Sequence, residues 1–287
     1  MPAAERYAMN ESLNVVLGDR RYRVERDWGE LPDGIRPTAI STVAVDSQGR
    51  VYAYRRGSPP VVVFDAAGRF VAAWGQDRIV DAHGIFVTGD DRVFLVNRDA
   101  HEVIECTPDG AVVRAIGRRH EPRFGAPFNH PTDVAVAADG EFYVTDGYGN
   151  ALVHRFDADG AHLQSCGEPG SGPGAFSVPH AVWIDKQDRV LVADRENNRI
   201  QAFDRNGAYL TEWGGFLHPM DLFVDDRGLI FVSDQTPSLC LLSPSGALLG
   251  RCKPMSNGAH GIWGNADGDL FLAEMDPSRL TKLSMIE

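Results

Sequence analysis

The chain has 287 residues, 43% hydrophobic and 24% charged, which is the composition of an ordinary globular protein. Its formal net charge is −12 and it has no basic run, so nucleic-acid binding is not expected, because phosphate recognition depends on Lys and Arg. No stretch approaches 18 apolar residues, and the amino terminus lacks the apolar core of a signal peptide. We therefore expect no membrane span and a cytoplasmic location.

The first candidate strand is YRVERDWGE, which starts at Tyr22 and precedes a series of repeats. The repeats share a segment of alternating or continuous apolar residues, a polar turn and a second apolar run. They start 42, 49, 48, 40 and 40 residues apart, at Ser41, His83, Thr132, His180, Met220 and His260. Repeats of this length that hold several short strands each are typical of β-propeller blades.

Each repeat is predicted to contain four antiparallel strands. The second and third strands are followed by turns, and the turn before the fourth strand ends in Gly five times, as in DAAG and TPDG. The fourth strand of the sixth repeat is missing, and the Tyr22 segment, with Trp28-Gly29 in the expected place, supplies it. We predict an all-β, six-bladed β-propeller over residues 1–287, a single domain closed by the amino-terminal strand so that no sheet edge is exposed.

The first position of the repeat carries histidine in every second blade, at His83, His180 and His260. In a ring of six blades these side chains should converge on the central channel from three directions. Three neutral imidazoles with an open fourth position are the ligand pattern of catalytic zinc. The sequence therefore predicts one metal ion per chain. A structural role in turns or core is the alternative interpretation for these histidines.

A second set of aligned residues follows the second strand, with Arg56, Arg98 and Arg195 in blades 1, 2 and 4. Blade 3 has Gly147 there, followed by Tyr148. Arginines in such positions are often solvated or form salt bridges, but near a metal they can bind a carboxylate in bidentate fashion. We predict that Arg56, Arg98 and Arg195 bind substrate.

The remaining histidines are interpreted as less important. His101, His120, His154 and His162 are expected to be solvated, whereas His130 and His218, two residues before a first position, are expected to approach the channel mouth.

The repeats are of the NHL type, and the chain resembles the peptidyl-α-hydroxyglycine α-amidating lyases. The resemblance is densest from Phe128 to Phe203, in the strings PTDVAV, VTDGYGN, PGAFSVPHAVW and VADRENNRIQAF. It implies zinc on His83, His180 and His260. It also implies a catalytic tyrosine at Tyr148 and functional arginines, catalytic as well as substrate-binding, at Arg56 and Arg195.

The chain also departs from the family pattern. Asn129 and Gly149 replace a disulfide, Gly258 replaces a methionine near the third histidine, and Gly261 replaces an aspartate of a structural calcium site. Calcium is therefore not expected to be required, although the carbonyls of Val43 and Ile85 remain available as ligands. The family's partner monooxygenase is absent from this sequence, so a separate hydroxylating enzyme is expected upstream.

The family reaction breaks the C–N bond of an α-hydroxyglycine and gives an amide and glyoxylate. The resemblance implies that a small-molecule or peptide α-hydroxyglycine is the substrate, with Tyr148 as acid/base and zinc as Lewis acid. Two alternatives remain open. One is a divergent zinc-dependent lyase or hydrolase that acts on a small metabolite, and the other is a non-enzymatic NHL interaction scaffold.

Overall fold

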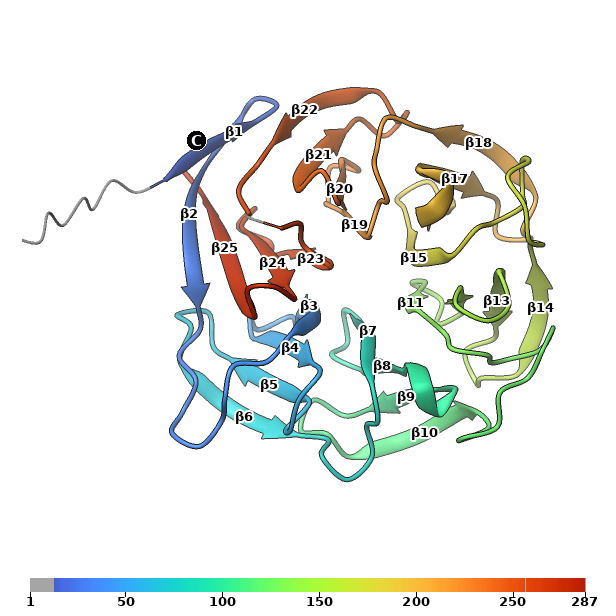
Figure 1. Ribbon diagram of the computed structural model, residues 1–287, viewed down its shortest axis with the longest axis horizontal. Coiled ribbons are helices and arrows are strands. Elements are labelled where there is room, and N and C mark those ends of the chain that lie inside the picture. Colours follow the sequence, from blue (N-terminus) through green and yellow to red (C-terminus); the bar gives the residue numbers. More distant parts are fainter. Residues whose placement is uncertain (1–12, 256, 287) are drawn as a thin grey trace, which may run out of the picture.

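Short runs of β-branched and aromatic residues, separated by turns rich in Gly, Asp and Asn, form six antiparallel sheets arranged in a ring (Figure 1). The structure is a computed structural model that describes residues 13–255 and 257–286. The predicted six-bladed propeller is confirmed. The predicted domain range of 1–287 also includes residues 1–12, 256 and 287, which lie outside the described residues.

The strands follow the chain around the ring. Blades 1 and 2 are β3(Ile40–Val45), β4(Val51–Arg55), β5(Val61–Phe64), β6(Phe70–Trp74) and β7(Ala82–Val87), β8(Val93–Asn97), β9(Glu102–Cys106), β10(Val112–Gly117). Blades 3 and 4 are β11(Asp133–Val136), β12(Phe142–Asp146), β13(Leu152–Phe156), β14(His162–Cys166) and β15(Pro179–Ile184), β16(Val190–Asp194), β17(Arg199–Phe203), β18(Tyr209–Trp213). Blade 5 is β19(Asp221–Val224), β20(Ile230–Asp234), β21(Ser238–Leu242), β22(Leu248–Cys252), and blade 6 begins with β23(Gly261–Gly264), β24(Leu270–Glu274), β25(Arg279–Met285).

The amino-terminal segment completes blade 6, as predicted. Strand β2(Arg20–Trp28) pairs antiparallel with β25, so that the two ends of the described chain share one sheet (Figure 1). A fifth strand, β1(Asn14–Leu17), was not predicted and pairs with β2 on the outside. The hairpin between them lies against blade 5, where a Cβ on Gly250 would come within 2.3 Å of the Gly18 nitrogen.

The recurring Gly and Trp positions are explained by packing between blades. The glycine of the turn before each fourth strand lies against the fourth-strand residue of the preceding blade. A Cβ on Gly110 would approach the Trp74 ring to 2.5 Å, and one on Gly246 would approach the Trp213 ring to 2.0 Å. Both glycines also have positive φ. These positions require glycine because the turn of one blade covers the indole of its neighbour.

The first strand of each blade lines the central channel. Three residues beyond the first position, about 10 Å further along each strand, Phe86, Trp183, Phe223 and Trp263 contact one another, with ring centroids 4.8–6.1 Å apart. These aromatic rings fill the channel on one side of the first positions. Any ligand of the first-position residues therefore approaches from the other side, where the first strands begin.

The described residues form only two helices, the single-turn 3-10 helices η1(Arg98–Ala100) and η2(Arg195–Asn197), and neither has the length needed to cross a membrane. Cys106, Cys166, Cys240 and Cys252 are all free thiols.

Candidate metal centre

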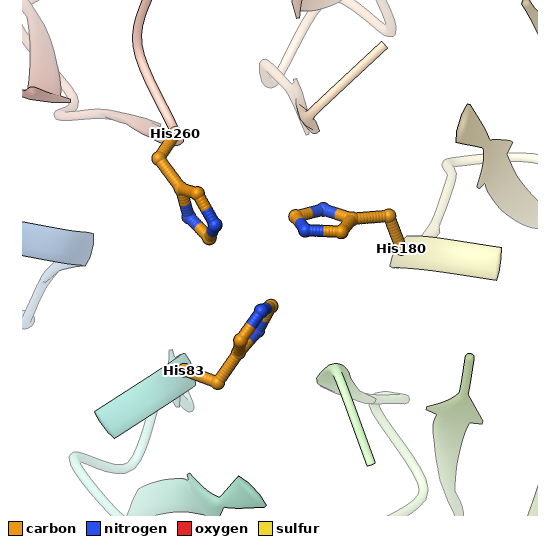
Figure 2. Close-up of side chains that lie close together, drawn as sticks. All are labelled: His83, His180 and His260. Carbon is orange, nitrogen blue, oxygen red and sulfur yellow. The ribbon is translucent and has the colours of Figure 1, made fainter. Parts of the chain in front are cut away.

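The three first-position histidines meet in the channel. Their imidazoles come from blades 2, 4 and 6 and point toward a common centre (Figure 2). The ring centroids of His83, His180 and His260 lie 4.9–5.0 Å apart, so the arrangement is close to three-fold symmetric. One ligand nitrogen from each ring lies within 4.8 Å of the others, and the described residues hold no other such group of three or more.

Each histidine is oriented by the neighbouring blade. The Nδ1 atom of His83 lies 2.6 Å from the Thr132 carbonyl oxygen, that of His180 lies 2.6 Å from the Met220 carbonyl oxygen, and that of His260 lies 2.7 Å from the Ser41 carbonyl oxygen. The acceptors are the first-position residues of blades 3, 5 and 1. Because a carbonyl oxygen can only accept, each Nδ1 carries the proton and donates it. The lone pair is therefore on Nε2, which faces the centre, in the outer-shell arrangement that metal-ligating histidines commonly show.

The histidines are held in the neutral form. Burial lowers the pKa of His83 and His180 well below the ordinary value, and the positive charges of Arg56 and Arg195 contribute in the same direction. Burial, followed by the charge of Arg56, lowers the pKa of His260 to about 3. Neutral imidazole is the form that binds a metal ion. The three residues thus meet the requirements of a divalent transition-metal site in tautomer, charge and spacing.

Tyr148 covers the open side of this centre. Its hydroxyl oxygen lies 3.1 Å from Nε2 of His83 and 3.2 Å from Nε2 of His180. The residue is 38% exposed, so the hydroxyl faces the histidines while the side chain borders solvent. The structure therefore brings the tyrosine and the three histidines together at one end of the channel.

Arg56 reaches the same region from blade 1. Its Nε atom donates to the Ser41 hydroxyl at 3.0 Å and lies 3.5 Å from a carboxylate oxygen of Asp81. In the described part of the chain, no hydrogen bond involves the two terminal nitrogens of this guanidinium. These donors remain available to a ligand.

Arg98 and Arg195 flank the Tyr148 ring, with guanidinium carbons 5.4 and 5.7 Å from the ring centroid. Both already have carboxylate partners. Arg98 pairs with Asp81 and Asp99, and Arg195 pairs with Glu196 at 2.7 Å. Arg195 also lies 3.4 Å from the tyrosine hydroxyl. All three predicted arginines therefore border the site, but among them only Arg56 has both terminal nitrogens uncommitted.

Two carboxylates in the channel were missed from the sequence. Asp133 and Asp221 line the small cavity at the histidines, and burial raises the pKa of both, to about 7 for Asp221. Each accepts a backbone N–H from the next histidine-bearing blade, of Val182 at 3.0 Å and Ile262 at 2.8 Å respectively. A signal was present, because the residue after the first position also alternates, with Asp in blades 3 and 5 and Gly or Ala in blades 2, 4 and 6.

The interpretation of the other histidines was partly wrong. His154 is completely buried, with Nε2 3.2 Å from Asp146, and His101 is also buried. His154 is buried because it lies on the third strand of blade 3, and His101 is buried in an edge-to-face contact with the His130 ring. His120 and His162 are exposed.

Comparisons with known proteins show which families this chain is similar to. A family model described as a 6-bladed beta-propeller matches residues 127–235. Mouse NHL repeat-containing protein 3 is 33% identical over 263 residues, which cover 84% of this chain and 75% of that protein. Peptidyl-alpha-hydroxyglycine alpha-amidating lyase 1 of Drosophila melanogaster is 27% identical in an alignment 315 residues long, which spans 96% of this chain and 56% of that protein.

Among solved structures, the gluconolactonase XC5397 from Xanthomonas campestris aligns with a TM-score of 0.72 over 94% of this chain and 91% of its own, at 19% identity. At that identity the likeness concerns the fold. The fold and the histidine cluster thus define a six-bladed propeller with a candidate metal centre in its channel. The chain belongs to the NHL-repeat family that contains NHL repeat-containing protein 3, and the amidating lyases are more distant relatives.

Proposed function

We propose that this protein is a zinc-dependent carbon–nitrogen lyase that cleaves an α-hydroxyglycine-type carbinolamide to an amide and glyoxylate. The observation that carries the proposal is the position of the Tyr148 hydroxyl, 3.1 and 3.2 Å from the Nε2 atoms of His83 and His180. A proton-transferring hydroxyl at the open side of a three-histidine centre is the pair of groups that this cleavage needs. The amidating-lyase relatives support the reaction type.

The reaction converts the carbinol C–O bond to a carbonyl, breaks the C–N bond and moves one proton from the hydroxyl to the nitrogen. His83, His180 and His260 would hold the zinc, which would supply Lewis acidity toward the substrate oxygen. The Tyr148 hydroxyl exchanges the proton with the substrate. The uncommitted nitrogens of Arg56 pair with the substrate carboxylate, which becomes the carboxylate of glyoxylate. The aromatic residues below the histidines confine the substrate to the mouth side.

The substrate class follows from this chemistry. An N-acyl-α-hydroxyglycine, free or at the end of a peptide, presents the carbinol and the carboxylate close together. Such a compound arises when an N-acylglycine is hydroxylated at its α-carbon, so a separate hydroxylating enzyme would supply it.

A second candidate is a lyase or hydrolase for a small metabolite without a carboxylate. It is favoured by the pairing of Arg98 with Asp81 and Asp99, and of Arg195 with Glu196. These carboxylates already neutralise two of the three arginines at the mouth, and an anionic substrate would have to compete with them.

The experiment combines metal analysis with a glyoxylate-release assay on N-benzoyl-α-hydroxyglycine. We expect one zinc per wild-type chain and glyoxylate release, with both lost in His180→Ala. His162→Ala removes an exposed histidine and is the matched control. Full zinc content in His180→Ala would contradict the ligand assignment. Zinc-loaded wild type that releases no glyoxylate would contradict the substrate, and wild type without metal or turnover would indicate a scaffold.

A further inference from the structure

Arg55, the last residue of β4, is a buried cation without an anionic partner. The described residues include three buried arginines, and the other two are paired: Arg20 with Asp225 at 2.7 Å and Arg199 with Asp194 at 2.9 Å. Arg55 is only 3% exposed and takes part in no ion pair of the described chain. Its one side-chain hydrogen bond, to the Ser58 carbonyl oxygen, is 3.5 Å long, and its Nε has no partner.

The other blades have the opposite kind of group at this position. The last residue of the second strand is an acid or an amide in every other blade: Asn97, Asp146, Asp194, Asp234 and Glu274. In blades 2 to 5 this side chain accepts the N–H of the residue three before the first position of its own blade. The donors are the N–H groups of Val80, Asn129, Ser177 and Leu217. A cation at position 55 cannot accept this bond.

Thr38 is the residue of blade 1 that corresponds to those donors. No side chain among the described residues accepts its N–H, and its hydroxyl is buried without a hydrogen-bond partner. Blade 1 therefore has hydrogen-bond donors without acceptors at the place where blades 2 to 5 have a side-chain acceptor. Arg55 and Thr38 both line the same cavity.

This cavity, which we call the seam cavity, lies between blades 6 and 1 and has a volume of about 110 Å³. Its walls are largely apolar and include Trp28, Phe64 and Leu280. Asp27 and Pro37 border it and are exposed, so it opens to solvent. It does not include the three histidines or Tyr148.

A guanidinium stays protonated even where burial lowers its pKa, as burial does for Arg55. Its charge therefore has to be balanced by an anion or by water, and an apolar wall favours an anion that brings carbon atoms with it. We propose that the seam cavity is a second binding site, for a small organic carboxylate whose apolar tail lies against Trp28 and Phe64. The carboxylate of the ligand accepts hydrogen bonds from Arg55 and Thr38, in the place of the side-chain acceptor that blades 2 to 5 carry.

The experiment uses the full chain and benzoate as the probe, with the indole N–H resonance of Trp28 as the readout. Trp28→Phe assigns this resonance. Trp28 lines the seam cavity, so its signal separates binding there from binding of carboxylate at the arginines of the channel mouth. We expect a saturable shift with benzoate, none with benzamide of the same shape, and none with chloride at equal ionic strength.

Arg55→Met should weaken benzoate binding at least tenfold, measured from the Trp28 shift, and should fold because it removes a buried unpaired charge. Arg36→Gln removes an exposed arginine of the same loop outside the cavity and should bind like wild type. Thr38→Val tests the second donor and should weaken binding about threefold or more.

The proposal would be overturned by the absence of a saturable Trp28 shift with benzoate in wild type, by equal shifts with benzamide, or by undiminished binding in Arg55→Met. A shift produced equally by chloride would show an inorganic anion site and would also overturn it. If Arg55→Met does not fold, the comparison of benzoate with benzamide on wild type decides. Glyoxylate release is measured separately, so failure of the proposed lyase function does not affect this result.

Discussion

The hydroxyl oxygen of Tyr148 lies 3.1 Å from Nε2 of His83, although 65 residues separate them in the chain. Tyr148 follows the second strand of blade 3, and His83 lies on the first strand of blade 2. The Thr132 carbonyl fixes the imidazole by accepting from Nδ1. The hydroxyl therefore lies next to the nitrogens that would bind the metal. We expect one bound substrate to contact both the metal and the proton-transferring hydroxyl.

Replacing Tyr148 with Phe should therefore lower kcat for α-hydroxyglycine cleavage by about 10²–10⁴-fold, the usual contribution of a positioned acid or base. KM and zinc content should change little, because the ring is retained and the hydroxyl acts mainly in the transition state. Steady-state kinetics with metal analysis on the same samples measures this. Tyr209→Phe, in an outer strand, is the control. A Tyr148→Phe enzyme with wild-type kcat would remove the tyrosine from the mechanism.

Arg56 and Arg98 should differ in their effects on substrate binding. Loss of an uncommitted charged donor in Arg56→Ala should raise KM for a carboxylate substrate by about 10–100-fold, from about 1.5–3 kcal/mol per charge-assisted hydrogen bond. The guanidinium of Arg98 is already bonded to Asp81 and Asp99, so Arg98→Ala should raise KM much less. Initial-rate measurements on both variants test the order. A larger KM effect from Arg98 would mean that the substrate displaces those carboxylates.

The sequence predicted residues that recur at one position of the repeat and missed contacts that join different blades. Histidine alternation and the arginines after the second strand are visible as aligned residues, and the structure brings them to one channel mouth. The hydrogen bond from His260 to the Ser41 carbonyl joins residues 219 positions apart, and no local sequence pattern predicts it. Arg55 was overlooked although the aligned residue of every other blade is an acid or an amide, because its burial and its lack of an anionic partner depend on the fold. Strand β1 was missed because no repeat of the pattern contains a fifth strand.

Ring closure can be tested by truncation. A chain that starts at residue 30 lacks β1 and β2 and exposes the edge of β25. It also loses the buried side chains of Leu17, Tyr22 and Val24, each worth about 1.5–3 kcal/mol. We expect aggregation and a lower melting temperature, measured by size-exclusion chromatography and thermal unfolding. A chain that starts at residue 13 keeps both strands and serves as the control. An equally stable monomer starting at residue 30 would show that closure by β2 is dispensable.

The last prediction concerns the acid sensitivity of the metal-free protein. Burial lowers the pKa of His260 to about 3 in the folded state, whereas an unfolded histidine titrates near 6.5. A lowered folded pKa means that the unfolded chain binds the proton more tightly between these values. The contribution of neutral His260 to stability is therefore complete above about pH 6.5 and is lost as the pH falls toward 3. His260→Gln removes this titration, so the stability of wild type relative to the variant should fall by about 2.5 kcal/mol from pH 7 to pH 4.5, at about 1.36 kcal/mol per pKa unit. Urea unfolding of both proteins in the presence of a chelator measures the difference, with His120→Gln as the exposed control. If wild type and His260→Gln lose stability in parallel over this range, His260 is not held neutral by the fold.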